Sequence, residues 1–319
     1  MPFPLAVLPS PAPLALLVER ANTFAQNSRA GSTRRAYFSD FETFRAWCAR
    51  QGLDPLPATP ATVAVYLADL ATLGRAPATI ERALAGIAHE HRARGFEWAR
   101  AHPAIGAVMR GIRRELGTAP NQKAPVEIAE LAALVAVLGD GLQDTRDRAI
   151  LTVGWFGAFR RAELVAITVA DVAEQREGIV VTLRRSKGDQ EGRGAEKGIA
   201  YASSLAICPV RSLAEWRARS KIATGPLFRS IDCKDRIGPR GLCDKMIALI
   251  VQRTAERAGL DPHNLAGHSL RAGFCTTAAR RGKSLDAIMR QTLHKSERVV
   301  RRYIRHAKVF DDNASVGLG

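Results

Sequence analysis

One short stretch without an apolar period divides this sequence into two parts. Residues 117–125 contain two prolines, a glycine and an asparagine, which favour turns over helices and strands. Before it, residues 14–118 have helical periodicity, whereas the part after it mixes helices with a region of alternating β-branched residues. We therefore expect a helical domain at 16–118, a linker at 119–125 and a mixed domain at 126–319. Residues 1–15, which are rich in proline, are expected to be a flexible leader.

The first domain is expected to be a small bundle of four amphipathic helices. In residues 32–51 the large apolar side chains recur at steps of three and four, and Gly52 follows as a helix stop. The other three helices are expected at 62–73, at 79–94 and after His102-Pro103. Each period leaves one apolar face for a common core.

The second domain is expected to be mainly helical with one small β-sheet. Residues 178–184 alternate and are rich in β-branched side chains, residues 186–194 are rich in turn formers, and residues 197–201 can return as a second strand. This pattern predicts a β-hairpin with Lys187 at its tip. Helices are expected at 126–138, 144–156, 160–169, 209–219, 242–258, 269–281, 285–293 and 296–305.

The charge of the chain favours a polyanionic partner. Its 319 residues carry 47 Lys and Arg against 31 Asp and Glu, a formal charge of +16, and both domains share the excess. Such a protein attracts nucleic acid and gains free energy from counterion release. The five cysteines are an odd number without a Cys-x-x-Cys pair, which argues against a disulfide framework and a zinc cluster. With no long apolar stretch and no signal-peptide start, we expect a cytoplasmic protein without metal or membrane partner.

Two pairs of residues could act on a phosphate. His268 and Arg271 are three apart in a predicted helix and share a face, so one could transfer a proton while the other holds a phosphate oxygen. Arg160 has Glu163 three residues on, close enough to orient its guanidinium. Each pair alone also fits an ordinary helix-surface contact.

Two lysines compete for a role beside these arginines. Lys187 lies at the expected hairpin tip, from which an ammonium could enter a DNA groove and protonate a leaving alkoxide, provided that nearby cations lower its pKa. Lys197, on the return strand, is the rival.

Tyr303 is the only one of the four tyrosines in a strongly cationic setting. Residues 280–308 contain ten Lys and Arg and two acidic residues, which attract phosphate and are expected to favour phenolate over phenol. Packing of Tyr303 against Val299 and Val300 is the structural alternative. His294 precedes Tyr303 by nine residues.

The candidate residues stand in the order of a known active site: Arg160, Lys187, His268, Arg271, His294 and Tyr303. In this order and spacing the chain resembles the tyrosine recombinase family, also called the phage integrase family. The contexts Arg-x-x-Glu-Leu around Arg160 and His-x-Leu-Arg-x-Gly around Arg271 are also those of the family. The resemblance is greatest to two-domain, Cre-like and Xer-like members. The chain departs from the family at Leu293, where a glycine commonly precedes the histidine.

The resemblance implies a fold and a reaction. A helical core-binding (SAM-like) bundle and an α+β catalytic domain would form a C-shaped clamp on DNA. Tyr303 would attack the scissile phosphate and form a 3′-phosphotyrosyl intermediate without metal, ATP or another cofactor. The two arginines would stabilise the transition state, Glu163 would support Arg160, and Lys187 would be the general acid. His268 would assist proton transfer, and His294 would donate to the phosphate.

The resemblance also implies partners. A site-specific recombinase of integration, excision or resolution would act in the bacterial cytoplasm, with the nucleoid, as a homotetramer on two DNA sites with inverted repeats. Off DNA it would be a monomer or a weak oligomer. The apolar tail at 309–318 is a candidate for packing on a neighbour or for folding back in cis. The candidate DNA-binding residues are Arg34, Arg35, Arg110, Arg113, Arg114, Lys123, Arg301 and Arg302.

Two other functions fit parts of the pattern. A type IB topoisomerase uses similar residues to nick and reseal DNA without exchanging partners. A non-catalytic DNA-binding regulator of the same fold would lack the tyrosine or an arginine, and this chain has both.

Overall fold

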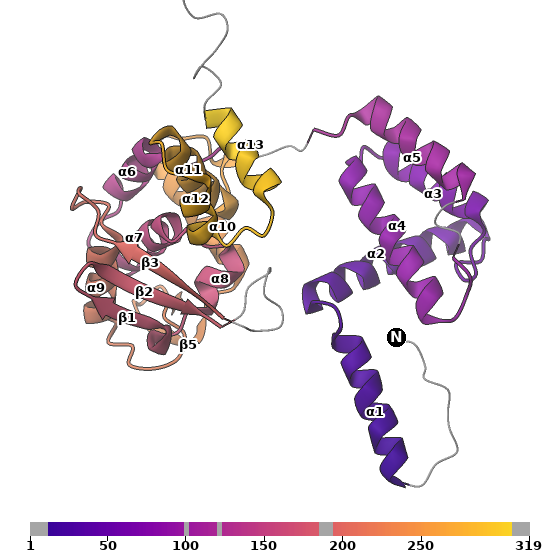
Figure 1. Ribbon diagram of the computed structural model, residues 1–319, viewed down its shortest axis with the longest axis horizontal. Coiled ribbons are helices and arrows are strands. Elements are labelled where there is room, and N and C mark those ends of the chain that lie inside the picture. Colours follow the sequence, from indigo (N-terminus) through magenta and orange to yellow (C-terminus); the bar gives the residue numbers. More distant parts are fainter. Residues whose placement is uncertain (1–11, 99–101, 120–122, 185–193, 308–319) are drawn as a thin grey trace, which may run out of the picture. The chain divides into compact units, whose positions relative to one another are not determined.

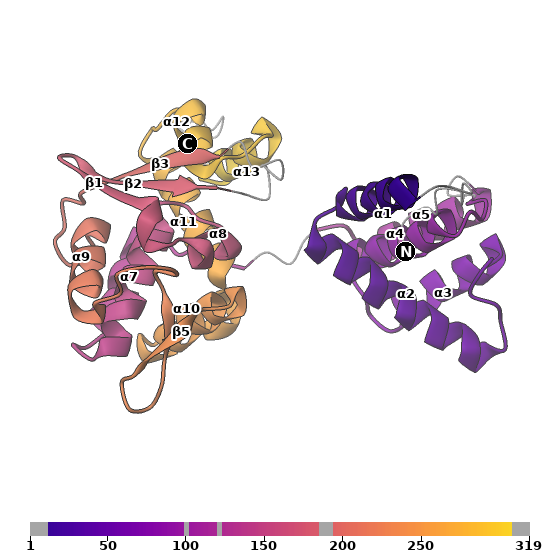
Figure 2. The same cartoon turned by 90° about the horizontal axis from the view of Figure 1, so that it is seen from below.

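Two compact units make up the chain, residues 1–121 and 122–319, in the computed structural model shown in Figures 1 and 2. The structure describes residues 12–98, 102–119, 123–184 and 194–307. Helices predominate, and the small sheets lie in the second unit, so the predicted fold class is confirmed. None of the helices within the described residues is long and apolar enough to cross a membrane.

The first unit contains one helix more than the sequence predicted. That helix, α1, begins inside the segment expected to be a leader. The predicted stop after the second helix is confirmed, since Gly52 adopts φ 66° and its N–H donates to the carbonyl of Ala49. The helices are α1 (Ala12–Asn27), α2 (Gly31–Gln51), α3 (Pro60–Thr72), α4 (Pro77–Ala93) and α5 (Pro103–Leu116).

Aromatic side chains form the centre of the first unit's core. The rings of Phe44 and Tyr66 lie 4.9 Å apart, and Trp47 lies 5.2 Å from the same tyrosine. Ile80 and Ile87 of α4 close this cluster and are fully buried. The core therefore consists of the residues whose helical period predicted one apolar face per helix.

The second unit follows the predicted order of helices with small shifts at their ends. Its helices are α6 (Ile128–Ala136), α7 (Leu142–Phe156), α8 (Arg161–Ala166), α9 (Pro209–Ser220), α10 (Asp244–Arg257), α11 (Gly267–Arg280), α12 (Leu285–Thr292) and α13 (Glu297–Ala307). Two short 3₁₀ helices lie at Val169–Asp171 and Pro262–Asn264. Figure 1 shows α11, α12 and α13 gathered together.

The predicted hairpin is part of a three-stranded antiparallel sheet. Its strands are β1 (Val172–Gln175), β2 (Gly178–Leu183) and β3 (Ala195–Ala200), in that order. The register of β2 and β3 places Val181 opposite Lys197. Periodicity missed β1 and a second, two-stranded sheet formed by β4 (Arg229–Ile231) and β5 (Ile237–Gly241), because these strands are too short to show an alternating pattern.

A close crossing fixes α11 against the start of the second unit. The N–H of Val126 donates to the carbonyl of Ser269 over 3.0 Å, and its carbonyl accepts from Trp155 Nε1 over 2.7 Å. A Cβ on Gly273 would lie 1.6 Å from that carbonyl oxygen. Only glycine fits at this position of the His-x-Leu-Arg-x-Gly segment, because a side chain there would overlap the backbone of Val126.

Candidate active site

Five of the six predicted catalytic residues lie within the described part of the second unit. They are Arg160, His268, Arg271, His294 and Tyr303, contributed by the start of α8, by α11, by the end of α12 and by α13. The sixth, Lys187, lies outside the described residues. Hydrogen bonds and mutual electrostatic effects on pKa connect the five.

Arg271 is the most buried of these residues, with 1% of its surface exposed. Its Nη1 donates to the carbonyl of Ala158 over 2.6 Å, and its Nη2 donates to the carbonyl of Thr292 and to His294 Nε2. Burial and the nearby Arg160 lower its pKa to about 10, which still leaves it charged at neutral pH. An arginine has five N–H donors. Three are thus held by the protein, and the described residues leave Nε and one Nη1 hydrogen for a substrate oxygen.

Arg160 is the N-cap of α8, and Glu163 holds it from two sides. The Oε2 atom of Glu163 accepts from the backbone N–H of Arg160 over 2.9 Å, and its Oε1 atom accepts from Arg160 Nη1. The carboxylate is 3% exposed and the arginine side chain 23% exposed. Such a charge-assisted, partly buried contact orients a guanidinium far better than a surface ion pair. The neighbouring Arg161 approaches Asp244 instead.

His268 and Tyr303 meet across two helices. His268 Nε2 and the Tyr303 hydroxyl are 3.2 Å apart, a hydrogen bond between α11 and α13. This distance is within the reach of a general base on the proton of its nucleophile. Since the imidazole is exposed and the tyrosine is half buried, the proton has a path from the hydroxyl toward solvent.

The expected phenolate is not what the surroundings of Tyr303 favour. Burial raises the pKa of Tyr303, Cys275 raises it further, and the lowering effects of Arg271 and Arg302 do not compensate. The side chain packs against the small core between α11, α12 and α13, which contains the fully buried Val300. The sequence showed the local charge but not this burial. The hydroxyl therefore keeps its proton at neutral pH and needs a base.

His294 is neutral, and its contacts define its tautomer. Burial, followed by the charges of Arg271 and Arg160, lowers the pKa of His294 to about 3. Because an arginine can only donate, His294 Nε2 accepts from Arg271 over 3.0 Å. The proton then lies on Nδ1, which donates to Thr292 Oγ1 over 2.7 Å, and that hydroxyl donates to the carbonyl of Ile288. If a phosphate oxygen replaced His294 Nε2 as the acceptor of the Arg271 hydrogen bond, Nε2 would have no donor. To donate to that phosphate from Nε2, His294 would need its proton on Nε2 instead of Nδ1.

Leu293 adopts a left-handed conformation at the position where the family commonly has glycine. Its φ and ψ are 54° and 41°, and its N–H donates to the carbonyl of Met289. An L-residue in this conformation costs roughly 1 kcal/mol or more. The turn directs the carbonyl of Thr292 and the ring of His294 toward Arg271, where both accept hydrogen bonds from its Nη2. This chain therefore makes a left-handed turn at this position without a glycine.

The residues that orient the candidate catalytic side chains were not predicted from the sequence. Thr292 orients His294 and accepts from Arg271 through its carbonyl. Lys197 appeared only as a rival to Lys187, yet it is buried and donates to the carbonyls of Gly157 and Ala158. The signal in the sequence was a lysine on a predicted strand whose neighbours two residues away, Ala195 and Ile199, are apolar.

Residues 126–309 match the sequence model of the phage integrase family. The match covers more than half of the chain. The chain belongs to this family, the tyrosine recombinases. The predicted resemblance is therefore confirmed.

Whole-chain relatives agree with this assignment. The recombinase is 41% identical over 301 residues to the integrase/recombinase xerD homolog of Selenomonas ruminantium, covering 92% of this chain and 87% of that protein. It is 26% identical over 293 residues to recombinase cre of Escherichia phage P1, covering 86% and 84%. Its fold matches the XerH site-specific recombinase bound to a palindromic difH substrate in a post-cleavage complex, with a TM-score of 0.63, 17% identity and coverage of 92% and 81%.

The predicted DNA-binding side chains of the recombinase differ in how they are engaged. Arg113 pairs with Glu81, Arg301 pairs with Glu297 over 2.9 Å, and Lys123 Nζ donates to the carbonyl of His263. All eight lie in described segments and are wholly or partly exposed: Arg34, Arg35, Arg110, Arg113, Arg114, Lys123, Arg301 and Arg302. Their positions permit contact with phosphate and leave their roles as predictions.

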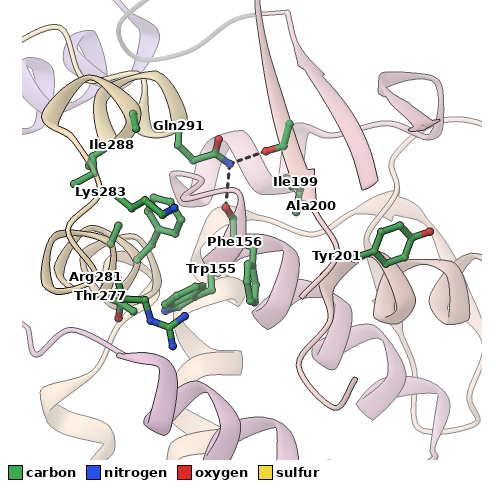
Figure 3. Close-up of a pocket in the computed structure, with 14 residues that line it drawn as sticks. Trp155, Phe156, Ile199, Ala200, Tyr201, Thr277, Arg281, Lys283, Ile288 and Gln291 are labelled. Carbon is green, nitrogen blue, oxygen red and sulfur yellow. Dashed lines mark hydrogen bonds between the residues drawn. The ribbon is translucent and has the colours of Figure 1, made fainter. Parts of the chain in front are cut away.

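A hollow of about 450 Å³ lies beside the site, behind β3 (Figure 3). Its apolar wall includes Trp155, Phe156 and Phe274, and Arg281 and Lys283 are exposed side chains of its lining. The hollow between β3, α7, α11 and α12 thus has an apolar wall and two exposed basic side chains.

Proposed function

We propose that this recombinase cleaves and rejoins duplex DNA at specific sites through a covalent bond between Tyr303 and a 3′ phosphate. The observation that carries the proposal is the hydrogen bond between Tyr303 and His268, made next to a buried Arg271 with donors to spare. A nucleophile, a base and a fixed cation are the parts that phosphoryl transfer to a hydroxyl requires. The names of its relatives point to the same activity.

The proposed step balances as a transesterification. The Tyr303 oxygen bonds to phosphorus, the bond from phosphorus to the 5′ oxygen breaks, and the tyrosine proton passes to His268 Nε2. Arg160 and Arg271 stabilise the charge on the non-bridging oxygens. Lys187 is proposed to protonate the leaving 5′ oxygen. Because the phosphotyrosyl bond conserves the energy of the phosphodiester, a 5′ hydroxyl from another strand reverses the step.

Binding is proposed to involve both units. Both halves of the sequence carry an excess of positive charge, which supports contact of each unit with duplex DNA. The bacterial relative supports a bacterial cytoplasm as the place of action, and association with the nucleoid is part of the proposal.

To test recombination, the DNA sequence that the recombinase cleaves is first selected from a random pool. Duplexes of random sequence carrying a single nick are incubated with the protein, and strands that remain attached to it in detergent are sequenced. Two copies of the recovered sequence in one plasmid should give deletion or inversion products. Relaxation of a plasmid without the sequence, and no recombinant product from the plasmid with it, would support a type IB topoisomerase instead. Specific binding without any covalent adduct would support a regulator.

We further propose that a homotetramer assembles through the tail at 309–318, which docks in the hollow behind β3 of a neighbouring protomer. The sequence of this tail, which lies outside the described residues, has Val309 and Phe310 followed by Asp311 and Asp312. An apolar pair fits the wall formed by Trp155, Phe156 and Phe274, and the two carboxylates complement Arg281 and Lys283. Apolar burial and charge complementarity thus favour the same occupant.

Charge reversal separates docking in trans from folding back in cis. Variant one carries Arg281→Glu and Lys283→Glu, and variant two carries Asp311→Lys and Asp312→Lys. Each alone should fail to recombine, and a mixture should also fail if every tail must meet its own hollow. If the tail docks in trans, a tetramer that alternates the two variants has matched charges at every interface. At half of the interfaces an acidic tail meets a basic hollow, as in wild type, and at the other half a basic tail meets an acidic hollow. Recovery of recombination by the mixture supports trans docking, and recovery only when all four changes are in one chain supports cis docking.

A further inference from the structure

The carbonyl at the end of α7 and the two that follow it accept hydrogen bonds from side chains of three other elements. A helix leaves its final C=O groups without partners inside the helix, and these carry the negative end of its dipole. The carbonyl of Phe156 accepts from Gln291 Nε2 over 3.0 Å, and the same amide donates to the carbonyl of Gly198 (Figure 3). The carbonyls of Gly157 and Ala158 accept from cations.

Lys197 supplies one of these cations from β3. It is 1% exposed, and its Nζ lies 2.7 Å from the carbonyl oxygen of Gly157 and 3.3 Å from that of Ala158. The Nζ also lies 4.6 Å from the centroid of the Phe159 ring, within reach of a cation–π contact. A helix C-terminus and an aromatic face together make a buried ammonium tolerable at this place.

Lys197 and Arg271 share one carbonyl acceptor. Arg271 Nη1 donates to the oxygen of Ala158 over 2.6 Å, from the side of α11, while Lys197 approaches from β3. Ala158 has φ 46°, in the left-handed region that L-residues rarely adopt. A strained residue persists only where its surroundings hold it. The two donors do so here, two residues before Arg160.

We propose that Lys197 is a positioning residue for strand cleavage: it clamps the turn at 157–159 so that Arg160 and Arg271 face the same phosphate. The proposal rests on the proposed function. It also explains how the sheet is coupled to the arginines, because β3 leads out of the hairpin segment that contains Lys187. Movement of β3 would shift the carbonyl that fixes Arg271.

Lys197 does not itself serve as the acid that protonates the leaving group. Its Nζ faces two carbonyls and a ring, and the residue is closed off from solvent. The charged groups around it are Glu163, which favours its protonated form, and Arg271 and Arg160, which oppose it. Burial is the largest influence and lowers the pKa of Lys197 to about 7. Either protonation state keeps the N–H donors that the two carbonyls need.

The test measures single-turnover cleavage of a nicked duplex that carries the sequence recovered by covalent trapping. Lys197→Met should lower the rate on the order of 100-fold, the usual effect of a small misplacement of catalytic groups. DNA affinity should stay within about twofold, because Lys197 lies away from solvent. Lys221→Met, an exposed lysine at the end of α9, is the matched control and should cleave like wild type. A Lys197→Met rate within about threefold of wild type would overturn the proposal.

A double-mutant cycle separates positioning from general damage to the fold. If Lys197 acts through Arg160, then Lys197→Met should cost less than about fivefold in an Arg160→Ala background. An undiminished loss in that background contradicts the positioning role. If Lys197→Met does not fold, the same cycle is run with Lys197→Arg, whose loss in rate should likewise shrink when Arg160 is absent. If wild type itself forms no adduct, the proposed function fails, whereas normal cleavage by the Lys197 variants overturns only this inference.

Discussion

At the scale of single residues, the site depends on cations that the protein holds before any substrate arrives. Arg271 donates to two backbone carbonyls and one imidazole, and Arg160 is fixed by a buried carboxylate. Groups held in this way need little reorganisation as charge develops on a phosphate. The cost of ordering them is met on folding.

Replacing Arg271 should therefore damage the chemical step more than binding. We expect Arg271→Ala to raise the barrier to cleavage by about 3 kcal/mol, on the order of 100-fold in rate, because loss of one such donor already costs that much elsewhere. The measurement is single-turnover cleavage of a nicked site at saturating protein. A rate within a factor of a few of wild type would show that Arg271 does not contact the transition state.

The depressed pKa of His294 predicts a sign for acid destabilisation. With a pKa of about 3 in the folded protein and near 6.5 in the unfolded chain, His294 binds fewer protons in the folded state between these values. The free energy of unfolding should thus fall as pH is lowered from 6.5 toward 3. His294→Gln removes this dependence, so it should lose less stability than wild type between pH 7 and pH 4.5 in urea titrations. Parallel losses in the two proteins would contradict the assignment.

Residue types and spacing were enough to predict Arg160, His268, Arg271, His294 and Tyr303 as candidates, because their order is a property of the sequence. Burial was not. The raised pKa of Tyr303 and the neutral His294 arise from packing between α11, α12 and α13, which no local pattern describes. The positive charge counted along the sequence predicted a phenolate at Tyr303, whereas burial raises the pKa of Tyr303 and favours the neutral phenol.

At the scale of elements, the helices were predictable and the short strands were not. Helix α2 shows a long apolar period and ends at Gly52, and α3 begins after a Thr59 cap, so local signals mark their limits. Strand β4 has three residues and β5 has five, and their side chains are mostly exposed or half buried. Without an alternating burial pattern, such strands give no periodic signal.

The crossing of α11 over Val126 predicts an intolerant glycine. We expect Gly273→Ala to lower the free energy of unfolding of the second unit by at least about 2 kcal/mol, because the added Cβ would overlap the carbonyl of Val126 and a hydrogen bond to Ser269 restrains that segment. Gly111→Ala is the control. A Cβ added there would meet no other part of the chain within 4 Å, so this variant should be neutral or add up to about 1 kcal/mol. Equal stability of the two variants in urea unfolding would refute the close crossing.

At the scale of the whole molecule, the charge of +16 predicts how DNA affinity responds to salt. Each phosphate contact contributes about 0.9 to the slope of log affinity against log salt. Arg114→Ala, at the exposed end of α5, should reduce the magnitude of that slope by the contribution of one phosphate contact. It should weaken binding to all DNA sequences equally. Lys221→Ala, on the second unit, should leave it unchanged. An unaltered slope for Arg114→Ala would remove this arginine from the interface.

An interruption of the helical period was readable from the sequence, since a stretch rich in Gly, Pro and Asn stands at residues 117–125. The additional helix α1 was not, because its start at Ala12 lies in a proline-rich segment whose composition resembles a leader. Assembly into a tetramer is still harder to predict from the sequence. The hollow behind β3, which we propose as the docking site, exists only after four elements have packed together.

The most direct test of the central claim is to find the residue that carries the DNA. Adducts on a nicked site are digested with nuclease and trypsin, which should cut after Arg302 and Arg305 and release residues 303–305. We expect a 3′-phosphonucleotide on Tyr303 in this peptide, and no adduct from Tyr303→Phe, although that variant still binds DNA. A nucleotide found on any other residue, or equal adduct formation by Tyr303→Phe, would contradict it.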